Sequence, residues 1–173
     1  MNKWYALYTR PRHEKKVLDL LIEKKQEVFL PMVTQIRLWK DRKKKVEMPL
    51  FPSYIFVNFD YKHRFDVLQT HGVVKIVNFK GEPASVPDWQ IASLKTMLEY
   101  PETLRTENYI KPGETIEVTE GPFKGMRGMV QNLKGNTRLI ITIDGIMQSV
   151  SVEIDTQFTK RYTEPSEKND RIY

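Results

Sequence analysis

Apolar side chains follow two kinds of pattern at the start of the chain. Trp4 to Tyr8 is an aromatic-rich run between polar flanks, which predicts a strand that ends at residues 9–11. Residues 12–26 carry apolar side chains at helical spacing, with charged side chains on the other side. A strand followed by an amphipathic helix that packs on a sheet is therefore expected.

The next segments also predict strands and helices. Residues 32–48 are extended in character around a charged centre, which predicts a hairpin with a charged tip. Residues 50–59 are the most apolar segment of the chain, and their β-branched and aromatic side chains predict a central strand. A short helix is expected over 62–70, a strand over 73–77 and a helix over 88–98.

The pattern changes after residue 100. Residues 101–109 hold few large apolar side chains and predict a linker. Residues 110–161 consist of short alternating segments separated by glycine turns, which is typical of a small β-barrel. We therefore expect one domain over 1–100, a linker over 101–109, a barrel domain over 110–161 and a polar tail over 162–173.

The charge is unevenly distributed. The chain has 173 residues, with 28 Lys and Arg against 22 Asp and Glu, and a formal net charge of +6. Residues 1–45 hold thirteen basic and five acidic side chains, or +8, so the remaining 15 basic and 17 acidic side chains give −2. A surface that faces a polyanion is expected in this first quarter of the chain.

Composition excludes several classes of protein. The absence of Cys excludes disulfides, zinc–thiolate sites and thiol nucleophiles. No uncharged stretch approaches the ~20 residues of a membrane span, and the first residues lack a signal-peptide core, so an intracellular protein without membrane contact is expected. Three scattered His residues make no zinc pattern, and no nucleophile–base arrangement or nucleotide loop is present. We expect no catalytic residue, no metal and no cofactor.

The glycines of residues 111–130 shape the backbone. Gly121 before Pro122 makes a tight turn, because Gly tolerates a positive φ and Pro fixes its own φ. Gly125 and Gly128 permit a bulge and a close approach of strands in a small barrel. A phosphate-binding loop is the alternative, but neither glycine pattern of such loops is present.

This segment resembles a KOW motif, the signature of the SH3-like barrel in the NusG family of transcription elongation factors and in some ribosomal proteins. N-terminal features in the same order as in that family extend the resemblance over residues 1–161: Trp4 and Tyr5 in the first strand, residues 30–34 after the first helix, residues 49–57 on the central strand, and residues 72–74 before the last strand. Details such as Pro-Met-Val-Thr and Pro-Leu-Phe-Pro are similar to the specialised RfaH and UpxY-type paralogues.

The resemblance implies a fold class and a polymerase-binding patch. The fold is an α+β N-terminal (NGN) domain, an antiparallel sheet with packed helices, joined by a linker to an all-β SH3-like (KOW) barrel. An apolar patch of the first domain would dock on the β′ clamp helices of RNA polymerase. The matching positions are Tyr8, Phe51, Tyr54 and Phe56. Alternation puts Tyr54 and Phe56 on one face, and the alternative is that all four are core residues of the sheet.

The resemblance also implies a second polymerase contact. His63 and Arg64 fall where RfaH-like proteins carry a short polar motif that reaches the gate loop of the β subunit. The next residue here is Phe65 instead of a small hydroxylated residue, so this chain departs from the motif.

Two basic clusters are candidates for contact with upstream or non-template DNA. The first lies at the end of the first strand and the start of the first helix and comprises Arg10, Arg12, Lys15 and Lys16. The second lies on the hairpin tip and comprises Arg37, Trp39, Lys40 and Arg42, followed by Lys43, Lys44 and Lys45. Cationic groups would neutralise phosphates, and Trp39 could stack on an unpaired base. The alternative for both clusters is a solvated surface.

For the barrel, the resemblance implies a surface that binds termination factor Rho or a small-subunit ribosomal protein. Phe123, Ile146 and Met147 are the apolar candidates there. In RfaH the corresponding segment can also fold as a helical hairpin that masks the polymerase patch, whereas the β-branched stretch 139–152 favours a barrel here.

The resemblance, together with the confined charge, implies a non-enzymatic elongation and antitermination factor. It would be a monomer of the bacterial cytoplasm, associated with the nucleoid through RNA polymerase, that suppresses pausing or termination on particular operons. The alternatives are an RNA- or ribosome-binding KOW protein and the housekeeping NusG factor itself.

Overall fold

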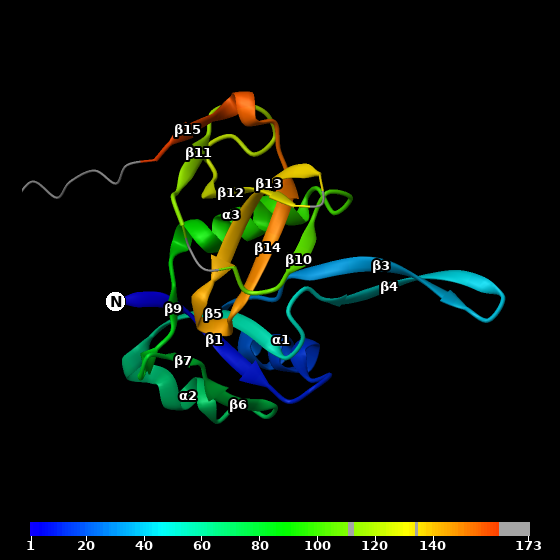
Figure 1. Ribbon diagram of the computed structural model, residues 1–173. Coiled ribbons are helices and arrows are strands. Elements are labelled where there is room, and N and C mark those ends of the chain that lie inside the picture. The colour runs from blue at the N-terminus through cyan, green and yellow to red at the C-terminus, as the bar shows by residue number, and fades with distance from the viewer. Residues whose placement is uncertain (111–112, 134, 163–173) are drawn as a thin grey trace, which may run out of the picture.

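The computed structural model describes residues 1–110, 113–133 and 135–162. Two antiparallel sheets stack on each other, and a long hairpin projects from the side of the molecule (Figure 1). The mixed α and β composition expected from the sequence is confirmed. Among the described residues, no helix has the length and apolar character that crossing a membrane would need.

The first sheet has the order β2-β5-β1-β6, with β9 paired to the start of β1. Its strands are β1 (Asn2–Thr9), β2 (Glu27–Phe29), β5 (Tyr54–Asp60), β6 (Val73–Ile76) and β9 (Ser85–Val86). Nearby, β7 (Asn78–Phe79) and β8 (Glu82–Pro83) form a small hairpin of their own. β5 lies between β2 and β1, so the expected central strand is confirmed.

Alternation along β1 and β5 gives this sheet two apolar faces. Helices α1 (Glu14–Glu23) and α2 (Arg64–Leu68) bury Val17, Leu21 and Val67 in a core with Leu7 and Ile55. The opposite face carries the other residues of the alternation and is covered by α3 (Asp88–Leu98) and by the second sheet. Both faces of the sheet are therefore occupied.

The central strand begins later than the sequence predicts. Strand β5 starts at Tyr54, and residues 50–53 form a turn instead of strand. Pro52 has no N–H to donate to a ladder, and Ser53 adopts a left-handed φ of +68°, which extended strand does not tolerate. The turn is closed by a bond from the N–H of Tyr54 to the carbonyl of Phe51, 3.1 Å long.

The expected hairpin is confirmed. Strands β3 (Met32–Trp39) and β4 (Arg42–Pro49) pair along their whole length, from Met32 opposite Pro49 to Trp39 opposite Arg42. They form a two-stranded sheet that is separate from the others. The hairpin projects from the body of the molecule (Figure 1), and residues 34–45 beyond its base are exposed, so their side chains can meet a partner.

The second sheet has the order β10-β14-β13-β12-β11-β15. Its strands are β10 (Arg105–Glu107), β11 (Ile116–Val118), β12 (Arg127–Leu133), β13 (Asn136–Ile143), β14 (Gln148–Glu153) and β15 (Thr159–Arg161). β10 lies inside the segment that the sequence marks as a linker, and it pairs with β14. Of the expected polar tail, residues 163–173 lie outside the described part of the chain.

Glycines fit the turns of the second sheet as expected. Gly121 and Gly125 adopt φ values of +80° and +81°, which side chains rarely tolerate. Gly128 allows close strand packing, because a Cβ atom there would lie 2.5 Å from the carbonyl oxygen of Ile140 on β13.

One continuous apolar core joins the two sheets. It contains Trp4 and Phe56 of the first sheet, Leu94 of α3, and Phe123 and Ile141 of the second sheet. The rings of Tyr100 and Phe123 pack edge to face across this junction with centroids 5.1 Å apart. Gln90 of α3 donates a 3.1 Å hydrogen bond to the carbonyl of Thr142 on β13. The structure therefore shows the second sheet docked on the first.

Candidate functional site

The four aromatic residues expected to bind polymerase lie together, and we call them the aromatic face: Tyr8, Phe51, Tyr54 and Phe56. Tyr8 and Tyr54 are cross-strand neighbours with ring centroids 5.5 Å apart, and Phe51 packs edge-on to Phe56 at 6.2 Å. Burial, and to a lesser extent the neighbouring Tyr8, raise the pKa of Tyr54. Its phenol thus remains a neutral hydrogen-bonding group at neutral pH.

The aromatic face is partly covered. Phe51 and Phe56 are fully buried in the core shared with the second sheet, whereas Tyr8 and Tyr54 are half-buried at its margin. The described residues between 105 and 162 carry the second sheet and its turns, and we call them the second unit. The cover is close-fitting, because a Cβ atom at Gly145 of this unit would lie 2.6 Å from the Cβ of Ala84. In this arrangement only the tyrosine edge of the aromatic face is open to a partner.

The first basic cluster, which we call the helix cluster, is exposed beside the aromatic face: Arg10, Arg12, Lys15 and Lys16. Arg12 takes a left-handed φ of +64°, so the chain turns sharply between β1 and α1. The buried Glu14 accepts a 2.8 Å hydrogen bond from the N–H of Ser53. This bond fixes the start of α1 against the turn that carries Phe51.

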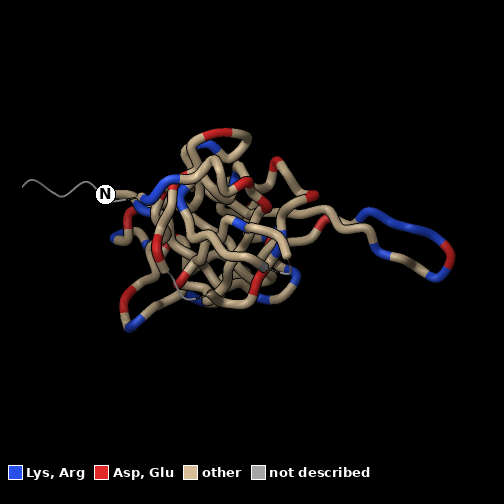
Figure 2. Tube along the Cα trace, turned by 45° about the horizontal axis from the view of Figure 1, so that its top comes forward, with Lys and Arg blue, Asp and Glu red and all other residues tan. Residues whose placement is uncertain are grey.

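The second basic cluster lies on the projecting hairpin, where Lys and Arg dominate the trace (Figure 2). Residues directly opposite each other in a β-ladder share a face. The register therefore puts Arg37, Trp39, Arg42 and Lys44 on one face, with Lys40 in the turn between the strands. The ammonium of Lys44 lies 5.4 Å from the centroid of the Trp39 ring. We call Arg37, Trp39, Arg42 and Lys44 the tryptophan face.

His63 and Arg64 lie at the far end of β5, away from the aromatic face. His63 is exposed, with Nδ1 3.9 Å from a carboxylate oxygen of Asp66, and Arg64 stacks on the rings of Tyr61 and Phe65 at 5.2 and 4.5 Å. Asp60 precedes this turn, and hydrogen bonds from the Met1 ammonium and from the N–H of Lys62 lower its pKa to about 2. The structure does not bring His63 and Arg64 together with the other candidate residues.

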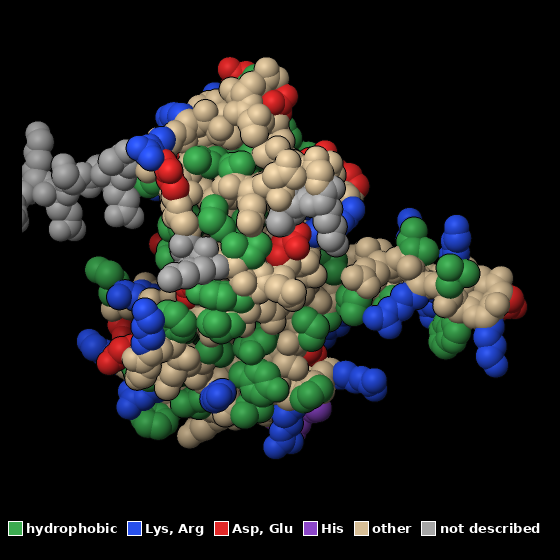
Figure 3. All heavy atoms as spheres, in the orientation of Figure 1, with side chains coloured by type: hydrophobic (Ala, Val, Ile, Leu, Met, Phe, Trp, Pro, Cys, Tyr) green, Lys and Arg blue, Asp and Glu red, His purple; other side chains and the backbone are tan. Residues whose placement is uncertain are grey.

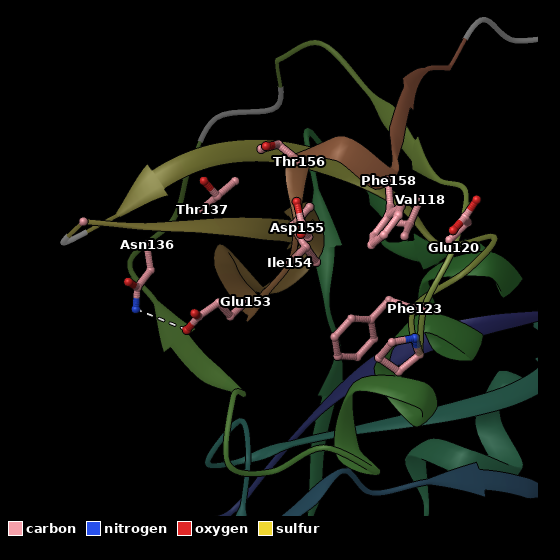
Figure 4. Close-up of a pocket in the computed structure, with 13 residues that line it drawn as sticks. Val118, Glu120, Phe123, Asn136, Thr137, Glu153, Ile154, Asp155, Thr156 and Phe158 are labelled. Carbon is pink, nitrogen blue, oxygen red and sulfur yellow. Dashed lines mark hydrogen bonds between the residues drawn. The ribbon is translucent and has the colours of Figure 1, made fainter.

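Phe123 and Ile146, two of the three apolar candidates in the second unit, are buried, and only Met147 is exposed. Phe123 instead helps to line a cleft of about 550 Å³, together with Val118 and Phe158 (Figure 4). Glu120, Glu153 and Asp155 also line it, and Asn136 donates a 3.1 Å hydrogen bond to Glu153. This cleft pairs an apolar floor with carboxylates.

Three residues that position the candidate groups were not identified from the sequence. Glu14 anchors the helix cluster, Glu47 pairs with Lys15 at 3.2 Å, and Gln90 bonds to the second unit. Glu14 could have been found from the sequence, because it is an acidic residue among basic ones at the start of α1, on the helix side that carries Val17 and Leu21. Within the part of the chain that the structure describes, no group of three or more His, Asp or Glu side chains is arranged to hold a metal ion.

Comparison with known proteins identifies the class. Residues 2–95, more than half of the chain, match the family model described as transcription termination factor nusG. The chain therefore belongs to the NusG family of transcription factors.

Its relatives include transcription termination/antitermination proteins NusG of three bacteria. The Rickettsia bellii protein is 25% identical over 92% of this chain and 90% of its own length. The Pseudomonas aeruginosa protein is 24% identical over 89% and 95%, and the Haemophilus influenzae protein is 26% identical over 88% and 91%. A solved structure described as domain interaction in Thermotoga maritima NusG has a TM-score of 0.50 and 21% identity, covering 94% of this chain and 98% of that one. That likeness supports the fold.

Proposed function

We propose that this chain is an operon-specific transcription elongation and antitermination factor that docks on RNA polymerase through the aromatic face. The rings would meet the β′ clamp helices, with His63 and Arg64 directed to the β gate loop. A factor that binds the active state of polymerase better than a paused state shifts the population toward elongation. The second unit would be the KOW barrel, a docking surface for Rho or a small-subunit ribosomal protein, and the site of action would be the bacterial cytoplasm.

The observation that carries this proposal is the bond between Glu14 and Ser53. It holds the start of α1, with its cationic surface, beside the turn that carries Phe51 of the apolar, phenol-edged surface. Aromatic side chains suit a protein interface that is apolar in the centre and wet at its rim, and exposed Arg and Lys suit phosphates. A domain that rests on polymerase can therefore reach upstream or non-template DNA at the same time.

A second candidate is an RNA- or ribosome-binding KOW protein, and the housekeeping NusG role is a third. The acidic lining of the cleft in the second unit argues against RNA binding there, since phosphates would meet Glu120, Glu153 and Asp155. Tight, salt-sensitive binding of RNA at this cleft would favour the second candidate.

Because the second sheet covers part of the aromatic face, loosening the junction is expected to strengthen polymerase binding. Gly145→Ala places a Cβ against Ala84 and should disfavour the docked arrangement, so we expect about threefold tighter binding to purified core polymerase. The matched control is the swap Gly145→Ala with Ala84→Gly, which removes the clash and should restore the original affinity. Equal affinity of all three proteins would show that the junction does not limit docking.

The helix cluster is expected to contact phosphates. Arg10→Gln with Lys16→Gln removes two exposed cations, so the slope of log affinity for a DNA fork against log salt should fall by up to about 1.8. Lys124→Gln, an exposed cation of the second unit, is the control and should leave the slope unchanged. An unaltered slope in the double variant would assign the helix cluster to a solvated surface.

A further inference from the structure

The projecting hairpin has a second face whose chemistry differs from that of the tryptophan face. The register puts Ile36 opposite Lys45 and Leu38 opposite Lys43, all on the side of the ribbon away from Trp39. We call these four residues the aliphatic face. At its base, Thr34 lies opposite Glu47, which pairs with Lys15 of α1.

The aliphatic face exposes apolar surface to solvent. Ile36 is 64% exposed and Leu38 is 82% exposed, on neighbouring positions of one side of the strand. Hydrophobic and basic side chains lie next to each other along the hairpin (Figure 3). Branched aliphatic side chains offer no ring for stacking on a base and no donor for a phosphate, so burial against apolar protein surface is the way they contribute to binding.

Charge identifies the kind of protein surface. Lys43 and Lys45 flank the two aliphatic side chains, so an occupant must present carboxylates beside its apolar groups. A second copy of this chain fits poorly, because a two-fold interface would bring the same lysines of both copies together.

We propose that the aliphatic face docks on an apolar surface bordered by carboxylates on RNA polymerase, while the tryptophan face remains directed to nucleic acid. This inference rests on the proposed function, since it places the hairpin between polymerase and DNA. A two-stranded ribbon can make both contacts at once, because its opposite faces are both exposed along most of their length. The hairpin is thus a further polymerase contact, separate from the aromatic face and from His63 and Arg64.

The test compares variants of the full chain for binding to purified core polymerase and to a single-stranded DNA oligonucleotide. Ile36→Ser with Leu38→Ser is expected to weaken polymerase binding by about tenfold and to change oligonucleotide affinity less than twofold. Lys43→Glu with Lys45→Glu should weaken polymerase binding similarly. The matched variant at the same spacing on the other face, Arg37→Ser with Trp39→Ser, is expected to lose most oligonucleotide binding. Thermal unfolding checks that each variant folds.

Four results would overturn the inference. If the Ile36/Leu38 pair lowers oligonucleotide affinity as much as the Arg37/Trp39 pair, the aliphatic face belongs to the nucleic-acid site. If that pair keeps full polymerase affinity while Tyr54→Ala loses it, the inference is wrong and the proposed function stands. If the wild-type chain sediments as a dimer that the serine pair dissociates, the face is a self-association surface. If the wild type does not bind polymerase at all, both proposals fail.

Discussion

Replacing Tyr54 by alanine is expected to weaken binding of the full chain to core RNA polymerase about 30-fold. Tyr54 lies at the open margin of the aromatic face, where it is half-buried and packs against Tyr8 at 5.5 Å. Aromatic anchors at the centre of an interface typically cost about 2 kcal/mol or more when truncated, which corresponds to roughly this factor. Equilibrium binding to immobilised core polymerase measures this loss of affinity.

Two controls separate docking from folding in this experiment. Tyr54→Phe keeps the ring and removes only the hydroxyl, so it should retain most of the affinity if apolar contact dominates. Val28→Ala truncates a half-buried side chain of β2 that packs in the core on the other face of the sheet, so it should leave polymerase binding near the wild-type value. Equal losses for Tyr54→Ala and Val28→Ala would mean that the aromatic face is a core feature and no interface.

Replacing Arg138 by methionine is expected to lower the free energy of unfolding by about 3 kcal/mol, because it leaves buried polar groups without their partner. The side chain is 7% exposed and lies within 3.9 Å of the carboxylates of Glu107 and Glu153. It donates a 2.7 Å bond to the hydroxyl of Ser151 and another bond to the carbonyl of Thr103. Arg138 thereby holds β10 on the edge of β14, and urea unfolding measures its contribution.

Arg105→Met is the matched control for this prediction. Arg105 lies on β10, the strand that Arg138 of β13 holds in place, but its side chain is exposed and donates hydrogen bonds to the carbonyls of Glu102 and Leu104. We expect a loss below about 0.5 kcal/mol there. A loss below about 1 kcal/mol for Arg138→Met would contradict the role of Arg138 as the group that holds the connecting segment in place.

Local patterns were sufficient to predict the hairpin and three strands of the first sheet, β1, β5 and β6, whereas β2 and β9 were not predicted. Alternation placed Tyr54 and Phe56 on one face, and the structure buries Phe56 in the core that α3 covers and packs the half-buried Tyr54 at its margin, opposite Ile55 and Val57. The start of β5 was predicted too early because apolar content outweighed Pro52, whose missing N–H ends the ladder. Apolar runs alone do not separate a buried turn from a strand.

Long-range contacts explain what could not be predicted. β10 is three residues long, and its strand character comes from pairing with β14 more than forty positions later in the chain. The burial of Phe123 likewise depends on Tyr100 across the junction between the two sheets. The position of Arg138 in a β-branched run could have predicted a buried polar contact, because a buried charge requires polar partners such as Ser151.

Single-round transcription with purified polymerase tests the central claim most directly. The template carries a pause site and a terminator behind the native leader, and a second template carries an unrelated leader. We predict that the wild type shortens the pause and raises readthrough on its own leader, and that Tyr54→Ala does neither. Unchanged pausing and readthrough with a protein that binds polymerase, or identical effects of wild type and Tyr54→Ala, would contradict the account.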